Sequence, residues 1–201
     1  PWAQRVELPI GDLVAVLDHL HADNTRYVTR SVANTLNDIS KIDPAAVVGT
    51  LKRWQKLDRQ DAKELAWMTN HALRTLMKTG NPLALELLGY ARKPKFKLAD
   101  LETTGVVQLG QEFAWRCAFT SLAAQKLKIS LRIHFLKANG SHAAKIFSLK
   151  NVSVAKNETI QIAKRLAFKP ITTRVLYPGT HFADLTINGM ASDKRAFDLV
   201  V

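Results

Sequence analysis

Residues 26–41 read RYVTRSVANTLNDISK, and this stretch decides the fold of the first half of the chain. Its apolar residues recur at helical spacing, at Val28, Val32, Leu36 and Ile39. Because successive residues of an α-helix advance by about 100°, the polar residues of the stretch fall on the opposite side. The pattern predicts an amphipathic helix that the chain enters through the polar residues 23–25.

The same spacing continues to about residue 90 and predicts about five helices in all. The other four are expected at Leu13–Leu20, at Pro44–Trp54, from about Asp61 to Gly80, and from Pro82 to Gly89. An offset of forty residues lays Asn34-Thr35-Leu36 on Arg74-Thr75-Leu76. That period is typical of HEAT-like helix pairs. Since about three or more such pairs are needed to bury their faces, we expect further helices before Pro1.

From about Arg92 the apolar residues alternate with period two between turn signals, which predicts β-strands. The clearest runs are Phe113–Phe119 and Leu127–Phe135, and Asn139-Gly140 marks a hairpin turn. Shorter strands are expected at residues 146–149, 160–163, 174–177, 182–187 and 196–201. About seven short strands in about a hundred residues are typical of an immunoglobulin-like sandwich. We therefore predict an α plus β chain of two domains: HEAT-like α-solenoid repeats over residues 1–92 and an Ig-like β-sandwich over residues 93–201.

The composition indicates a folded, basic protein. Lys and Arg number 29 against 17 Asp and Glu, a net charge of +12, with 15 basic and 11 acidic residues before position 101 and 14 and 6 after it. Such an excess suits a polyphosphate or an anionic membrane, or simply a solvated surface. No run of about 18 apolar residues predicts a membrane span. Cys117 is the only cysteine, which excludes an internal disulfide and favours the cytoplasm, and the start at Pro1 indicates an internal fragment.

Two helices carry polar faces that are candidates for binding. In the helix predicted at residues 26–41, one sector holds Arg26, Arg30, Asn34, Asn37, Asp38 and Lys41. In the helix predicted from about Asp61 to Gly80, one sector holds His71, Arg74 and Lys78. Equivalent faces of stacked repeats line up, so these residues predict a basic track suited to phosphates. Acids are scarce on both faces, so we expect the arginines to stay free of salt bridges within their own helices. The alternative is an ordinary solvated face with pairing along the helix.

Single residues of these faces have two interpretations each. Asp38 is a lone carboxylate among cations, so it is either a catalytic group or the partner of Arg30 or Lys41. His71 either contacts a phosphate or base edge or makes a capping or interhelix hydrogen bond. Trp67 is assigned to packing. The sequence contains no cluster of metal ligands, no Gly-rich phosphate loop and no nucleophile elbow. We therefore expect neither a metal nor a cofactor.

Several segments carry a family resemblance. They are residues 30–34, residues 36–41, Pro44, Trp54, residues 71–76, Lys78, Gly80, Ala84-Leu85, residues 88–90, residues 172–174, residues 177–179, His181 and Asn188-Gly189. Together they resemble the AlkC group of alkylpurine DNA glycosylases, over nearly the whole chain. Proteins of that group are longer, with further HEAT-like helix pairs on the N-terminal side.

The resemblance implies hydrolysis of the N-glycosidic bond of cationic alkylated purines such as 3-methyladenine. Double-stranded DNA that contains alkylated bases would be the partner of a monomer. Because the leaving base is already positively charged, a carboxylate that stabilises the developing oxocarbenium sugar suffices, and Asp38 best matches that position. The lesion would stay in the duplex, against aromatic rings for which Trp2 and Trp54 are candidates. In the sandwich, Arg174 and His181 would contact the DNA backbone, although Arg174 could equally stabilise a strand end.

Two other classes of function remain open. One is a non-catalytic HEAT-repeat protein that binds DNA or senses damage, which would bind a duplex in a salt-dependent way without releasing bases. The other is a scaffold protein, since helical solenoids and Ig-like modules commonly bind peptides.

Overall fold

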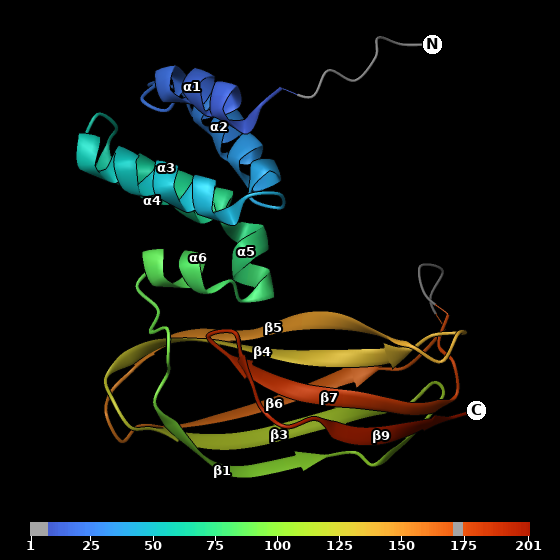
Figure 1. The fold of residues 1–201 in the computed structure, drawn as a ribbon. Coiled ribbons are helices and arrows are strands. Elements are labelled where there is room, and N and C mark those ends of the chain that lie inside the picture. Colours follow the sequence, from blue (N-terminus) through green and yellow to red (C-terminus); the bar gives the residue numbers. More distant parts are fainter. Residues whose placement is uncertain (1–7, 171–174) are drawn as a thin grey trace, which may run out of the picture. The chain divides into compact units, whose positions relative to one another are not determined.

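The computed structural model describes residues 8–170 and 175–201. The chain divides into two compact units, residues 1–88 and residues 89–201. Helices form the first unit and β-strands form the second (Figure 1). The prediction of an α plus β chain is confirmed. No described helix has the length and apolar character that crossing a membrane would require.

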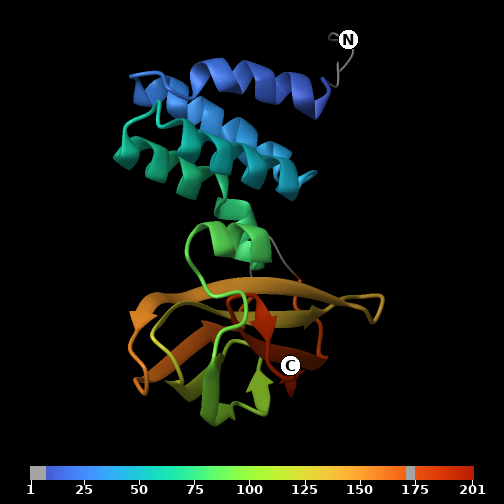
Figure 2. The same cartoon turned by 60° about the vertical axis from the view of Figure 1, so that its left-hand side comes forward.

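The helical unit has six helices among its described residues. They are α1 (Ile10–Leu20), α2 (Arg26–Ile39), α3 (Pro44–Leu57), α4 (Ala62–Ala72), α5 (Arg74–Thr79) and α6 (Pro82–Leu87). Helix α2 packs against α1, α3 and α4, and α3 packs against α6 (Figure 2). The apolar face identified in residues 26–41 is buried, with Val32 and Leu36 in one core with Leu51 and Met68. Burial of this face fixes which side of α2 remains available to a ligand.

Local signals set the helix bounds. The Asp43 carboxylate accepts the backbone N–H of Ala46 at 2.9 Å, with Pro44 in the first turn of α3. Asp61 caps α4 in the same way through the N–H groups of residues 63 and 64, and Asn81 caps α6. Gly80 ends α5 with a φ of 76°, a left-handed conformation that glycine adopts at little cost. The side chains of Asp43, Asp61 and Asn81 satisfy N–H groups that have no partner within the helix, and the N–H of Gly80 satisfies carbonyls at the end of α5.

The fourth expected helix is broken into α4 and α5 at Leu73. The carbonyl of Ala72 accepts the side-chain amide of Asn37 at 2.9 Å, and the carbonyl of His71 accepts Arg74 Nη1 at 2.6 Å. Side chains therefore take acceptors that a continuous helix would give to its own backbone. The Asn37 side chain is buried in this contact, so Asn37 is not part of an exposed polar face.

The second unit is a sandwich of two sheets. Its strands are β1 (Phe96–Thr103), β2 (Val106–Gln108), β3 (Glu112–Ser121), β4 (Gln125–Leu136), β5 (His142–Val154), β6 (Thr159–Ala167), β7 (Gly179–Ile187), β8 (Met190–Ala191) and β9 (Arg195–Val200). One sheet has the order β1-β3-β6 and the other β2-β9-β7-β4-β5, with β8 paired to β7 (Figure 1). Every pairing is antiparallel except that of β2 with β9.

The alternating residues of β3 and β4 fill the space between the sheets. Phe113 and Trp115 from one sheet and Ile129 and Leu131 from the other are fully buried in one cluster. The hairpin between β4 and β5 turns at Gly140, with a φ of 75°. The strand expected at residues 174–177 is wrong for residues 175–177, which are in no strand, and residue 174 lies outside the described residues. Strands β1 and β2 were not predicted, because apolar and polar residues do not alternate clearly in these segments.

Candidate nucleic-acid interface

Three polar side chains meet where α2 lies beside α4 and α5. The side-chain oxygen of Asn34 accepts Nη2 of Arg74 at 3.1 Å and is 2.9 Å from Nε2 of His71. Arg74 also donates through Nη1 to the backbone carbonyl of His71. Residues from three helices thus form one exposed hydrogen-bonded group. We call Arg30, Asn34, His71 and Arg74 the polar cluster, because Arg30 is also close enough to act on the His71 ring.

An aromatic column continues the polar cluster along α4. The His71 ring stacks on Trp67, with 4.8 Å between ring centroids and 14° between planes, and the guanidinium of Arg26 lies 3.9 Å from the Trp67 ring centroid. Trp67 packs on the helical core as expected, and it also joins a surface column that the sequence analysis missed. Its spacing of four residues from His71 is the signal that could have revealed this, since such residues share a helix face.

Arg26 forms no salt bridge within its own helix, as expected, but it is not a free cation. Its guanidinium pairs with the carboxylate of Glu64, with Nε 2.9 Å from Oε2. Thr29 donates to the other carboxylate oxygen. The scarcity of acids along α2 did not show whether Arg26 is neutralised, because its partner Glu64 lies on the neighbouring helix α4.

The polar cluster, together with the nearby Lys78, keeps an excess of positive charge. Arg30 and Lys78 are exposed and form no ion pair with another described residue. Lys78 lies four residues beyond Arg74, on the same side of α5. Burial and the charges of Arg74 and Arg30 lower the pKa of His71, so its ring is neutral near pH 7. The cluster therefore offers guanidinium groups, which can bind phosphate, beside a neutral histidine.

Asp38 lies one helical turn beyond Asn34 and is exposed, with 70% of its side chain accessible. Its carboxylate pairs with Lys41 at 2.6 Å, the partner that the sequence offered as one alternative. Asp38 also lines an open groove of about 660 Å³ with Ile10, Leu13 and Ile42. A pair this exposed contributes little to stability, so either partner can turn to a ligand.

Trp54 is not available to a damaged base, which corrects its assignment as a contacting ring. The side chain is fully buried, and Nε1 donates to Asp18 at 2.7 Å. Its ring stacks on His21 with centroids 4.5 Å apart. Although burial opposes ionisation of Asp18, hydrogen bonds from Arg53 and Trp54 hold the pKa of Asp18 below its usual range. Trp54 fills the space between helices.

His181 is also buried, and the expectation that it touches DNA is wrong for the chain as folded. Its Nδ1 accepts the backbone N–H of Leu136 at 3.2 Å, and Nε2 donates to the carbonyl of Tyr177 at 3.0 Å. Both ring nitrogens are thus used to hold β4 and the turn before β7. The two remaining site candidates, Trp2 and Arg174, lie outside the described residues.

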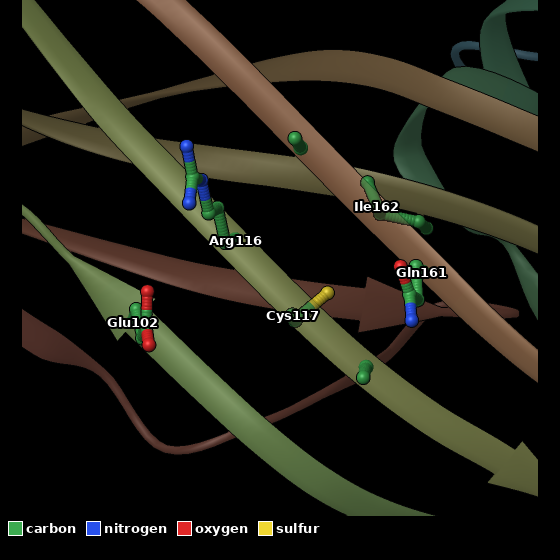
Figure 3. Close-up of a pocket in the computed structure, with 7 residues that line it drawn as sticks. Glu102, Arg116, Cys117, Gln161 and Ile162 are labelled. Atoms are coloured by element: carbon green, nitrogen blue, oxygen red, sulfur yellow. The ribbon is translucent and has the colours of Figure 1, made fainter.

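A hollow of about 510 Å³ lies on the three-stranded sheet of the second unit. Figure 3 shows Glu102, Arg116 and Gln161 coming from β1, β3 and β6 around it. Cys117 also lines it, but burial raises the pKa of the thiol, which disfavours the reactive thiolate. Within residues 8–170 and 175–201, no three His, Cys, Asp or Glu side chains gather as metal ligands would. The polar cluster is the stronger candidate site, because hydrogen bonds between helices hold its side chains in place.

The chain is thus of a two-unit class, in which a helical unit that carries a basic polar cluster is followed by an Ig-like β-sandwich. The chain belongs to the family described as "Uncharacterised protein YhaZ, C-terminal Ig-like domain", which matches residues 97–201. The protein YhaZ of Bacillus subtilis (strain 168) is 32% identical over 203 residues, which cover 99% of this chain and 56% of YhaZ.

A solved structure extends the likeness to both units. It is Pseudomonas fluorescens alkylpurine DNA glycosylase AlkC bound to DNA containing an abasic site analog, with 36% identity and a TM-score of 0.84. The match covers 95% of this chain and 53% of AlkC. The resemblance to the AlkC group is therefore confirmed. The chain spans about half the length of these two relatives.

Proposed function

We propose that this chain is the C-terminal part of a DNA base-excision repair glycosylase. The enzyme would hydrolyse the N-glycosidic bond of cationic alkylated purines such as 3-methyladenine, as a monomer in the bacterial cytoplasm. The observation that carries the proposal is the polar cluster, in a chain that is 36% identical to a DNA-bound AlkC over 95% of its length. An abasic site is what remains when a glycosylase has removed a base.

The charge of the chain supports a nucleic-acid partner. The net charge is +12, and the arginines at positions 30 and 74 flank one surface site. Phosphate contacts supply most of the sequence-independent affinity of DNA-binding proteins. Among the four members of the polar cluster there is no carboxylate to neutralise either guanidinium. The cluster is therefore suited to holding the backbone next to a damaged nucleotide.

We assign the helices to the end of a HEAT-like solenoid. Helices α2 and α4 pack as one pair of neighbours and α3 and α6 as another, which is the contact pattern of two stacked helical hairpins. The exposed apolar residues Val16 and Tyr27, 56% and 76% accessible, lie on α1 and α2, where a preceding repeat would pack. Part of the active-site cleft would belong to such repeats.

The chemistry assigned to this part of the enzyme is electrostatic. A cationic purine leaves without protonation, so a general acid is not needed, and the transition state gains most from a carboxylate near the sugar. Asp38 is the candidate, and its weak pairing with Lys41 leaves it free to reorient. DNA phosphates would compete with Asp38 for the Lys41 ammonium group.

The test measures binding and catalysis separately. A fluorescein-labelled duplex should bind the chain with an affinity that falls steeply with salt, and Arg74→Ala should weaken binding about tenfold. Lys63→Ala, which removes an exposed cation from α4 outside the cluster, is the matched control. Release of 3-methyladenine from methylated DNA is then measured for the longer parent enzyme and for its Asp38→Asn variant. Equal release rates remove Asp38 from the mechanism.

A non-catalytic DNA-binding protein is the second candidate. The ion pair of Asp38 with Lys41 favours it, because a neighbouring cation accounts for this carboxylate without a catalytic role. Duplex binding without base release by the longer parent would support this candidate. Failure to bind DNA at low salt would instead point to a scaffold and would reject both DNA-based functions.

A further inference from the structure

The His71 ring has a defined tautomer, which follows from its contact with Asn34. A guanidinium nitrogen can only donate a hydrogen bond, so the Asn34 atom beside Arg74 Nη2 is the oxygen. That oxygen carries no hydrogen, so His71 Nε2, 2.9 Å away, must be the donor. In a neutral ring the other nitrogen, Nδ1, then has a lone pair and no hydrogen.

The ring is also fixed in position. Trp67 stacks on it from the same helix, and Arg74 holds the backbone carbonyl of His71. The charged groups that face the ring are Arg30 from α2 and Arg74 from α5, and both disfavour a second proton on it. Nδ1 makes no hydrogen bond to another described residue. It is thus an acceptor on a ring that Trp67 and Asn34 hold in place.

A hydrogen-bond acceptor cannot bind a phosphate, because phosphate oxygens are acceptors as well. The donors that DNA presents in its grooves are the amino groups of its bases. A water molecule on the DNA surface, which donates through its O–H groups, is the other source of a donor. The arginines of the cluster suit the backbone, whereas His71 suits a donor beside it.

We propose that His71 Nδ1 accepts a hydrogen bond from a base amino group, or from a water held by the DNA, while Arg30 and Arg74 hold the adjoining phosphates. Asn34 is a positioning residue, which selects the tautomer and does not itself touch the ligand. This inference rests on the proposed function. Of the phosphate and base-edge contacts that the sequence offered for His71, it selects the base edge, or a water held there, and names the acceptor atom.

The tautomer is measured first, on the free chain, by long-range proton–nitrogen NMR of the histidine rings. Wild-type His71 should show an unprotonated Nδ1 and a protonated Nε2 at neutral pH. Asn34→Asp, which puts a full negative charge beside Nε2, should shift the ring towards the doubly protonated form. Asn70→Asp adds the same charge on α4, where the native side chain bonds the carbonyl of Ala66, and should leave His71 unchanged. A proton on Nδ1 of the wild type overturns the proposal.

Binding of labelled duplexes then tests the contact. His71→Ala should weaken binding about three- to tenfold, and His71→Gln, which keeps a neutral acceptor, should recover part of the loss. His19→Ala removes an exposed histidine from α1 and is the control. Duplexes with inosine for guanosine, purine nucleoside for adenosine, or pyrimidin-2-one nucleoside for cytidine lack one amino group each, so together they cover every base amino group. Loss of the His71→Ala effect on one of them identifies that amino group, and an equal effect on all of them identifies water.

The two failures can be told apart. If wild-type chain and Arg74→Ala alike do not bind DNA, the proposed function fails, and the ligand contact inferred for His71 fails with it. If the wild type binds and His71→Ala binds equally well on every duplex, only the inference about His71 is overturned. A His71→Lys variant that binds like wild type on every duplex would likewise reject a neutral acceptor.

Discussion

The polar residues that carry the family resemblance are used differently in the two units. In the helical unit, Arg30, Asn34 and Arg74 are exposed and meet in the polar cluster. In the Ig-like unit, His181 and Asn188 are buried. Asn188 accepts the N–H of Lys128 at 2.7 Å and donates to two backbone carbonyls, of residues 91 and 126.

The difference shows that a polar residue shared with the AlkC group can indicate a ligand site in one region and a structural role in another. Buried polar side chains must find partners, and a turn residue that supplies them is costly to replace. Asn188, with a φ of 49°, also adopts a left-handed conformation that asparagine tolerates better than most residues. We therefore propose that Arg30, Asn34 and Arg74 serve ligand binding, whereas His181 and Asn188 serve the fold.

Trp54→Ala should have the largest effect on stability, because it is the one tryptophan of the resemblance that the helical core buries. Loss of a buried indole is expected to cost about 3–5 kcal/mol of the free energy of unfolding. Urea unfolding followed by far-ultraviolet circular dichroism measures it. Trp54→Phe keeps much of the ring but loses the bond to Asp18, so it should cost about 1–2 kcal/mol. Unchanged stability with weaker DNA binding would return Trp54 to the ligand site.

Arg132→Met should have the next largest effect, now in the Ig-like unit. Arg132 binds the buried Asp184 through Nε and Nη2 at 2.9 and 3.0 Å, and His134 Nε2 is 2.8 Å from the same carboxylate. Removing one partner of a buried pair is expected to cost about 3 kcal/mol, because the other charge stays buried. The double variant Arg132→Met with Asp184→Leu should recover most of that loss.

The matched control for Arg132 is Arg116→Met. Arg116 is an exposed arginine on β3 that forms no ion pair within the described part of the chain, so its loss should change stability by less than about 0.5 kcal/mol. The comparison between the units breaks if Arg132→Met leaves stability intact and weakens duplex binding as strongly as Arg74→Ala does.

Much of the fold could be predicted from periodicity alone. The spacing of Val28, Val32 and Leu36 gave α2, and the alternation in β3 and β4 gave the sandwich, because both patterns record which face is buried. The break at Leu73 could not be predicted. It depends on Asn37, which is 35 residues from the carbonyl that it binds.

The candidate site was predicted in part for the same reason. Helix geometry placed Arg30 and Asn34 on one face and His71 and Arg74 on another, but it could not show that the two faces meet at one oxygen atom. Nor could it show that Glu64 neutralises Arg26 across helices. Trp54 is a different case, because its spacing from Val47 and Leu51 already indicated the buried face. For Trp54, the resemblance suggested a ligand contact and the helical periodicity suggested burial, and the side chain is buried.

The smallest expected effect is the pH dependence that His181 gives to the Ig-like unit. Burial lowers the pKa of His181 below the value of about 6.5 that an unfolded chain has. The unfolded state therefore binds more protons below about pH 6.5, and stability that is complete above this pH is lost as the pH falls towards the folded pKa. A single group changes the free energy of unfolding by at most about 1.4 kcal/mol per pH unit.

Urea unfolding between pH 8 and pH 5 (about the titration range of histidine) measures this slope, and His181→Gln should flatten it. The control is His142→Gln, because His142 lies near His181 but is exposed, and its ring hydrogen-bonds the carbonyl of Thr180. Protonation of His181 would put a hydrogen on Nδ1 against the N–H of Leu136, so the loss should be tied to the β4 end of the sandwich. If stability instead rises on acidification, His181 gains a partner for its charge, and the structural assignment of this residue fails with it.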